Sequence, residues 1–103
     1  MNELEKAIYD TLTSEGEKVE KCTVCKKKED EEAVFVWCDL EYEDGNILVP
    51  FVIYHTGEFF TPVDWQAFDL NAMEEMSMDE IEWRYGLTNI LGVMLNGKPR
   101  IFR

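Results

Sequence analysis

The sequence predicts an α+β fold in which an N-terminal helix, an antiparallel β-meander of three to four strands and a C-terminal helix packed on the sheet follow one another. Two stretches near the ends of the chain repeat apolar residues at helical spacing, and the middle alternates apolar and polar residues around an Asp-Gly turn signal. A length of 103 residues, 46% of them hydrophobic, supports one core. We therefore expect a single compact domain over residues 1–103.

The first expected element is a helix over residues 3 to about 14. Asn2 is followed three positions later by Glu5, and this is the capping-box relation that begins a helix. The pattern ends near Gly16, and the apolar residues that recur every four positions within it are Leu4, Ile8 and Leu12. We expect this helix to cover one side of the sheet.

The next elements are strands. Residues 19–25 have a short mixed pattern that is compatible with an edge strand, and residues 26–32 are all charged, which favours a loop. Residues 33–42 and 47–54 are the strongest strand signals, and they flank Asp44-Gly45, a frequent hairpin turn. A further strand is expected at residues 58–61, ended by Pro62.

The hairpin pattern assigns residues to the two faces of the sheet. A register that pairs Tyr42 with Ile47 places Leu40, Cys38, Val36 and Val34 on the core side. The opposite side is acidic near the turn and aromatic farther away. A two-residue Asp-Gly turn would place Pro50 in a hydrogen-bonded pair opposite Asp39, and proline lacks the N–H that such a pair needs. We therefore expect a four-residue loop or a bulge.

The last third of the chain has helical spacing. Ser77 and Glu80 repeat the capping-box relation, and glycines at positions 86 and 92 allow a break in the helix. Residues 64–76 are expected to form a short helix or an ordered loop. The apolar stripe of the C-terminal helix comprises Trp83, Leu87, Ile90, Leu91 and Met94 and ends at Asn96-Gly97.

Composition and the N-terminal sequence indicate the cellular compartment of the protein. The longest apolar run, residues 47–54, is much shorter than the roughly 20 residues that span a bilayer, and the acidic N-terminus does not resemble a signal peptide. Three cysteines, an odd number, do not make a secreted disulfide framework. We expect a cytoplasmic protein with reduced thiols and no membrane association.

One set of residues resembles a metal site. Cys22, Cys25 and Cys38 with His55 would form a Cys3His zinc set. The hairpin register separates Cys38 from His55 by about four residue pairs, roughly 13 Å, which is too far for one ion. We therefore expect no metal and no cofactor, and we keep a zinc-stabilised domain using Cys22, Cys25 and Cys38 as an alternative.

The sequence offers no catalytic constellation. His55 is the sole histidine, no glycine-rich phosphate loop is present, and carboxylates are so numerous that any one pair is uninformative. We expect no enzyme activity and no catalytic residues.

Charge is segregated along the chain. The formal net charge is −12, and residues 29–82 hold sixteen Asp and Glu and no Lys or Arg. This sign disfavours direct binding to nucleic acid or to an anionic membrane. One explanation is that the protein's own bases fold back and neutralise the acids, namely Lys6, Lys18, Lys21, Lys26, Lys27, Lys28, Arg84, Lys98, Arg100 and Arg103. The other explanation is a negative surface for a basic partner.

The leading hypothesis is a small acidic inhibitor that binds the basic nucleic-acid-binding surface of another protein. Asp39, Glu41 and Glu43 alternate along one strand about 7 Å apart, which is comparable to the phosphate spacing of a nucleic-acid strand. Phe59, Phe60 and Trp65 are the candidate apolar anchors of this interface. The other candidate carboxylates are Asp44, then Glu29, Asp30, Glu31 and Glu32, and in extension Glu74, Glu75, Asp79, Glu80 and Glu82.

Several classes of protein work in this way. They include anti-CRISPR and anti-restriction proteins of phage counter-defence, antitoxins, and immunity proteins of nuclease toxins, and the likeness is one of charge and size. The alternative from another class is an adaptor or homodimerising module. Such a module would dock through the second sheet face, which carries Phe35, Trp37, Val52 and Tyr54.

Overall fold

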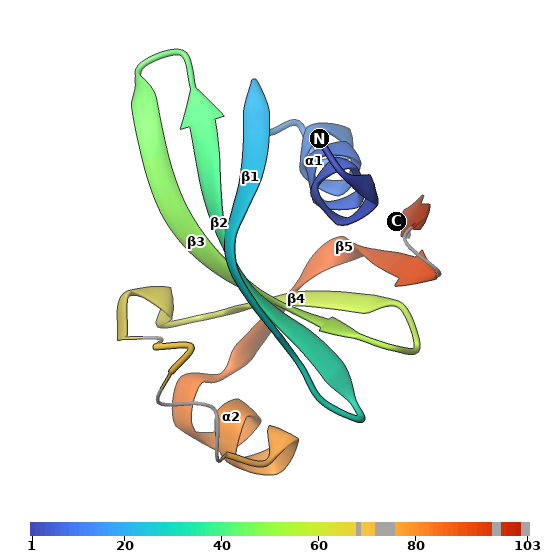
Figure 1. Cartoon of the computed structure of the whole chain (residues 1–103), viewed down its shortest axis with the longest axis vertical. Coiled ribbons are helices and arrows are strands. Elements are labelled where there is room, and N and C mark those ends of the chain that lie inside the picture. The colour runs from blue at the N-terminus through green and yellow to red at the C-terminus, as the bar shows by residue number, and fades with distance from the viewer. Residues whose placement is uncertain (68, 72–75, 96–97, 102–103) are drawn as a thin grey trace.

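The structure, a computed structural model, describes residues 1–67, 69–71, 76–95 and 98–101 and confirms the α+β class (Figure 1). None of the described helices is long and apolar enough to cross a membrane. The elements are α1 (Glu3–Ser14), β1 (Lys21–Glu29), β2 (Ala33–Tyr42), β3 (Gly45–Tyr54), β4 (Glu58–Pro62), the 3-10 helix η1 (Trp65–Ala67), α2 (Met78–Tyr85), β5 (Leu87–Leu95) and β6 (Lys98–Ile101).

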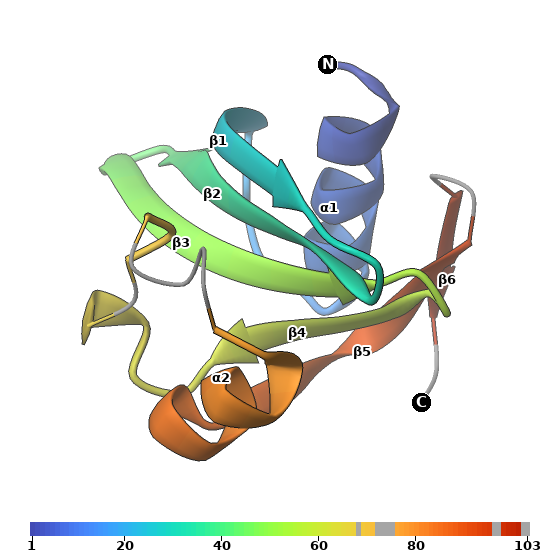
Figure 2. The ribbon, with the colours of Figure 1, turned by 60° about the horizontal axis from the view of Figure 1, so that its bottom comes forward.

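The strands form one antiparallel meander in the order β1-β2-β3-β4-β5-β6. The sheet is curled so that both of its ends approach α1, which contacts β1 on one side and β5 and β6 on the other (Figures 1 and 2). The meander is longer than the three to four strands expected, because the chain after residue 86 pairs with β4 instead of continuing as a helix.

The capping box of α1 is confirmed. The Glu5 N–H donates to the Asn2 side chain at 2.8 Å, and the Asn2 N–H donates to Glu5 Oε1 at 2.9 Å. The second oxygen of Glu5 accepts a hydrogen bond from the Val24 N–H at 2.7 Å. One carboxylate therefore starts the helix and fastens it to the edge strand β1.

The first core lies between α1 and the face of the sheet that the sequence assigned to it. Phe51 and Phe59 stack there with their ring centroids 5.0 Å apart, which contributes about 0.5–1.5 kcal/mol beyond burial. Thr11 is fully buried, and its hydroxyl donates to the Ala7 carbonyl at 2.8 Å. The core consists of Ala7, Ile8, Leu12, Val19, Cys22, Val36, Cys38, Leu40, Phe51, Ile53 and Phe59.

The charged run after Cys25 is a strand, and the expected loop over residues 26–32 is wrong as far as Glu29. Lys26, Lys27 and Lys28 pair with Trp37, Val36 and Phe35 of β2. The register shifts between Val24 and Lys26, so Cys25 forms a bulge. Pairing with a buried central strand outweighs the weak strand preference of lysine, because strand preference depends strongly on tertiary context.

The hairpin of β2 and β3 has the predicted faces, but its turn is shorter than the expected four-residue loop. Tyr42 pairs with Gly45 across a two-residue turn, Glu43-Asp44, so the expected pairing with Ile47 is displaced by two residues. The assignment of residues to the two faces is unchanged, because side chains alternate with a period of two and the register is displaced by two. Gly45 has φ +145°, a conformation that favours glycine, and Pro50 lies opposite Trp37.

The second core lies on the other face of the sheet, under α2. The helix begins at its predicted N-cap, where the Glu80 N–H donates to the Ser77 hydroxyl at 3.3 Å. It ends at Gly86, whose φ is +66°, so the expected helix is wrong from Leu87 onward, and Asn96-Gly97 lies outside the described residues. The core consists of Ala33, Phe35, Val52, Leu70, Met78 and Ile81.

Candidate functional site

The predicted carboxylates fall into two groups at opposite ends of β2. Glu29–Glu32 form the end of β1 and the turn that precedes β2, and Asp39–Asp44 end β2 and form the next turn (Figure 1). Nine residue steps of β2 separate the two ends, about 30 Å along the strand. The structure does not join the two groups into one continuous row.

The group at the β2–β3 turn lies beside one of the protein's own cations, Lys21. Asp39 and Glu41 share the α2 side of the sheet, and Lys21 of β1 is paired with Glu41. Asp39 Oδ2 accepts a hydrogen bond from the Asn46 amide at 3.2 Å. Glu43 and Asp44 are turn residues, so the predicted three-carboxylate spacing along one strand is reduced to two. This group is the weaker candidate for binding a basic partner.

The group at the β1–β2 turn is held in a fixed shape. Asp30 Oδ1 accepts hydrogen bonds from the N–H groups of Glu32 at 2.7 Å and Ala33 at 2.8 Å. His55, which follows β3, donates its backbone N–H to the Glu32 carbonyl at 3.0 Å and its Nε2 to the Asp30 carbonyl at 2.8 Å. His55 Nε2 also lies 3.7 Å from Glu29 Oε1. The turn is therefore tied to the end of β3.

Tyr54 brings carboxylates of other segments to the same place. Its hydroxyl donates to Glu82 Oε1 of α2 at 2.5 Å. Burial, followed by the hydrogen bond to Glu82 and the charges of Glu82, Glu58 and Glu32, raises the pKa of the Tyr54 phenol. Three segments distant in sequence thus contribute negative charge around one side chain. We call the set Glu29, Asp30, Glu31, Glu32, Glu58 and Glu82 the acidic end.

The predicted aromatic anchors have different environments. Phe59 is fully buried and stacks on Phe51, so it is a core residue and cannot contact a partner. Phe60 is half-buried and meets the Tyr54 ring edge-to-face at 5.4 Å. Trp65 is half-buried in η1. Strand alternation separates Phe59 from Phe60, because neighbouring residues point to opposite faces.

An aromatic anchor that the sequence analysis missed lies on α2. Trp83 is 88% exposed, although tryptophan is highly buried on average. The sequence placed Trp83 in the apolar stripe of a long helix, but Gly86 ends the helix first. Met78 and Ile81 make the buried side of α2, and Trp83 follows Glu82 of the acidic end. Asp79 and Glu80 are exposed on the same helix, and Glu74 and Glu75 lie outside the described residues.

The cysteines do not gather with other ligands. Cys22 and Cys38 are buried in the first core, and Cys25 is exposed on the bulge. A hydrogen bond with Cys22, followed by burial, raises the pKa of the Cys38 thiol, so it is held protonated. Among the described residues, no three His, Cys, Asp or Glu side chains are placed to hold a metal ion, which leaves the zinc alternative without support there.

The face expected to serve an adaptor is largely covered. Phe35 and Val52 are 3% and 0% exposed beneath Leu70 and α2, whereas Trp37 and Tyr54 are half-buried at its margins. Homodimerisation through these four side chains would require α2 to leave the sheet.

Comparisons with models of protein families, with curated proteins and with solved structures found no match to this chain. A functional conclusion therefore depends on the chemistry and placement of its own side chains.

Proposed function

We propose that the protein is a small, non-enzymatic cytoplasmic inhibitor that occupies the basic nucleic-acid-binding surface of another protein with its acidic end. The observation that carries this proposal is the meeting of three segments at Tyr54, which donates to Glu82 of α2, pairs with Ala33 next to Glu32, and is joined to Glu58 by the short turn between β3 and β4. Anti-CRISPR, anti-restriction and nuclease-immunity proteins are the classes that this chemistry fits.

The acidic end suits such a partner because part of its shape is fixed before binding. The side chain of Asp30 holds the turn, and Tyr54 holds Glu82, so little conformational entropy remains to be lost at these positions. The net charge of −12 adds a long-range field that steers a cationic surface toward the molecule. Salt weakens this steering because the Debye length falls as ionic strength rises.

Trp83 supplies the apolar contact that charge alone lacks. Exposed tryptophans are enriched among the residues that dominate binding energy at protein interfaces. Trp83 adjoins Glu82 on α2, so a partner pocket that receives the indole would be bordered by Lys or Arg side chains that pair with the carboxylates. Phe59, which the sequence suggested for this role, belongs to the core.

The test measures binding to purified basic nucleases, namely RNA-guided endonucleases, restriction endonucleases and nuclease toxins, with duplex DNA as competitor. We expect the protein and DNA to exclude one another and the affinity to fall with added salt. An affinity unaffected by DNA would contradict the proposal, as would a complex insensitive to salt.

A pair of charge-matched variants separates the acidic end from net charge. Glu32→Gln with Glu58→Gln changes the acidic end, and Glu3→Gln with Glu20→Gln removes two exposed carboxylates elsewhere. We expect the first pair to slow association about five- to thirtyfold and the second to have much less effect, because exposed pairs contribute up to about 1 kcal/mol each. Equal effects would mean that only total charge matters.

Trp83→Ala tests the anchor. Because the indole is 88% exposed, its removal leaves the fold unchanged, and we expect dissociation to accelerate about thirtyfold, as for a side chain contributing about 2 kcal/mol to binding. Sedimentation at low and high salt tests the alternative function. A dimer whose stability does not depend on salt would favour an adaptor or homodimerising module.

A further inference from the structure

Two adjoining hollows lie on the α2 side of the sheet, and the larger is bordered by Lys28, which directly precedes Glu29 of the acidic end. The larger has a volume of about 390 Å³ and is lined by Lys26, Lys27, Lys28, Leu70 and Asn71. The smaller has a volume of about 240 Å³ and is lined by Cys25, Lys26, Trp37 and Leu48. Lys26 borders both hollows, and we call the two together the groove, with a cationic part and an apolar part.

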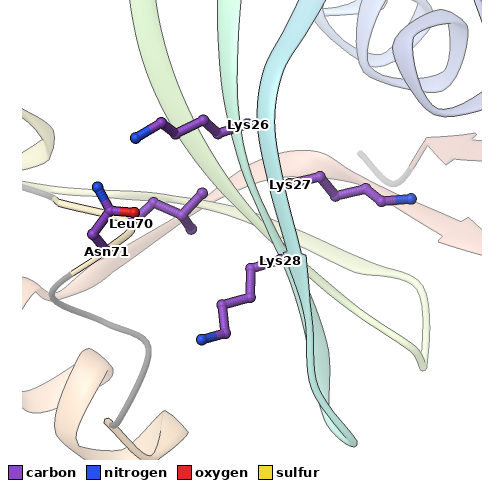
Figure 3. Close-up of a pocket in the computed structure, with 5 residues that line it drawn as sticks. All are labelled: Lys26, Lys27, Lys28, Leu70 and Asn71. Atoms are coloured by element: carbon purple, nitrogen blue, oxygen red, sulfur yellow. The ribbon is translucent and has the colours of Figure 1, made fainter.

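The cationic part is built by the alternation of β1. Figure 3 shows the side chains of Lys26 and Lys28 on the side where Leu70 and Asn71 lie, whereas Lys27 points the other way. Lys26 is exposed, Lys28 is half-buried, and Asn71 faces them from the segment that follows η1. Two ammonium groups and a side-chain amide therefore border the larger hollow.

The apolar part begins one strand farther into the sheet. Trp37 of β2 is paired with Lys26, and its half-buried indole borders the smaller hollow together with Leu48, which is 51% exposed. The covering provided by Leu70 and α2 stops at this point, so the groove marks the boundary between the covered and the open half of the sheet face.

We propose that this groove binds a small organic phosphate, with the phosphate between Lys26 and Lys28 and the apolar group of the ligand over Trp37. Lysine ammonium groups bind phosphate as compact point charges, and a phosphate monoester carries nearly two negative charges at neutral pH, which two ammonium groups can balance. The volume of the larger hollow lies within the range of about 300–1,000 Å³ typical of small-molecule sites.

Protection of the sheet edge is the competing explanation for these lysines. Charged side chains and bulges on edge strands discourage pairing with other chains, and β1 is an edge strand with a bulge at Cys25. Edge protection explains the charge of the strand. It does not explain a ligand-sized hollow bordered by Leu70 and Asn71, nor an apolar hollow that shares Lys26 with it.

The test is an NMR titration of the full chain with phenyl phosphate, inorganic phosphate and phenol. We expect phenyl phosphate to shift the amide signals of residues 25–28, 37, 48 and 70–71 and to bind at least about tenfold tighter than either fragment, because it contacts both hollows. Equal affinities of phenyl phosphate and inorganic phosphate would overturn the proposal, and so would shifts confined to other residues. A hexaglutamate peptide that binds as tightly as phenyl phosphate would also overturn it.

Variants of neighbouring lysines provide the matched control. Lys26→Ala removes an ammonium group from the groove, and Lys27→Ala removes one that points away from it. We expect Lys26→Ala to weaken phenyl phosphate binding about fivefold or more and Lys27→Ala to weaken it less than about twofold. Equal weakening would indicate attraction to the general charge of β1. Both substitutions are at strand positions, so circular dichroism confirms that each variant remains folded.

Discussion

The two faces of the sheet use alternate residues of the same strands for different purposes. The face under α1 is apolar along β2 and β3 and holds the stacked Phe51 and Phe59. The face under α2 is covered only over its aromatic half, and its margins carry the acidic end and the lysine-lined groove. The difference shows that both faces contribute a core, whereas only the second face keeps polar and charged margins beside its core.

The largest expected effect follows from Phe59 and Phe60, which point to opposite faces. Phe59→Ala opens a cavity in the first core and should lower the free energy of unfolding by about 3–5 kcal/mol. Phe60→Ala should cost about half as much, because Phe60 is half-buried. Urea denaturation followed by circular dichroism measures both values. Equal losses would show that the two faces contribute equally to stability.

The next effect concerns how α1 is fixed over its face. Glu5→Ala removes the hydrogen bonds to the Asn2 and Val24 N–H groups and should cost about 1–2 kcal/mol. Glu3→Ala, in the same helical turn, is the control, because Glu3 is exposed and takes no part in the capping box. A loss as large for Glu3→Ala would mean that the charge, not the hydrogen bonds, stabilises α1.

The contribution of Glu5 also depends on pH. Its hydrogen bonds with the Asn2 and Val24 amides hold the pKa of the carboxyl below its usual value of 4.5. A lowered folded-state pKa gives stability that is present above the usual value and is lost as the pH falls through the lowered one. The stability gap between the native chain and Glu5→Ala should therefore be constant at neutral pH and narrow in acid. A gap that widened in acid would contradict this assignment.

Local signals in the sequence predicted elements whose causes are local. The capping box at Asn2 and Glu5 and the alternation of residues 33–42 required no knowledge of partners, and both were confirmed. The strand at residues 26–29 and the change from helix to strand after Gly86 depend on pairing with β2 and β4, which are brought alongside only by the fold. Short-range patterns do not contain that information.

The candidate site was predicted only in part for the same reason. An extended strand separates residues that are near in sequence, such as Glu32 and Asp39, by most of its length. The fold as a whole gathers residues that are distant in sequence, such as Glu32, Glu58 and Glu82 near Tyr54. The count of acids in residues 29–82 indicated a negative surface, but the register decided which acids lie beside lysines.

The smallest expected effect on stability is that of Tyr54→Phe, which probes the negative charge of the acidic end. Tyr54→Phe removes one hydrogen bond to an exposed carboxylate and should cost about 0.5–1.5 kcal/mol at neutral pH. Because the folded-state pKa of Tyr54 is raised, the stability linked to its ionisation is full below the usual tyrosine pKa of 10.0 and declines as the pH rises through the raised value. The difference in free energy of unfolding between the native chain and Tyr54→Phe should therefore become smaller in alkali.

Tyr42 is the control for Tyr54. Burial and the single carboxylate of Glu17 raise the pKa of Tyr42, whereas burial and three carboxylates raise the pKa of Tyr54. In an absorbance titration of the tyrosines, the component that ionises at the highest pH should be absent from Tyr54→Phe and present in Tyr42→Phe. The change Glu32→Gln with Glu58→Gln should lower the pKa of Tyr54 and leave that of Tyr42 unaltered. Equal responses of the two tyrosines would mean that burial alone sets the Tyr54 titration, and the acidic end would then lack the concentrated field that a basic partner requires.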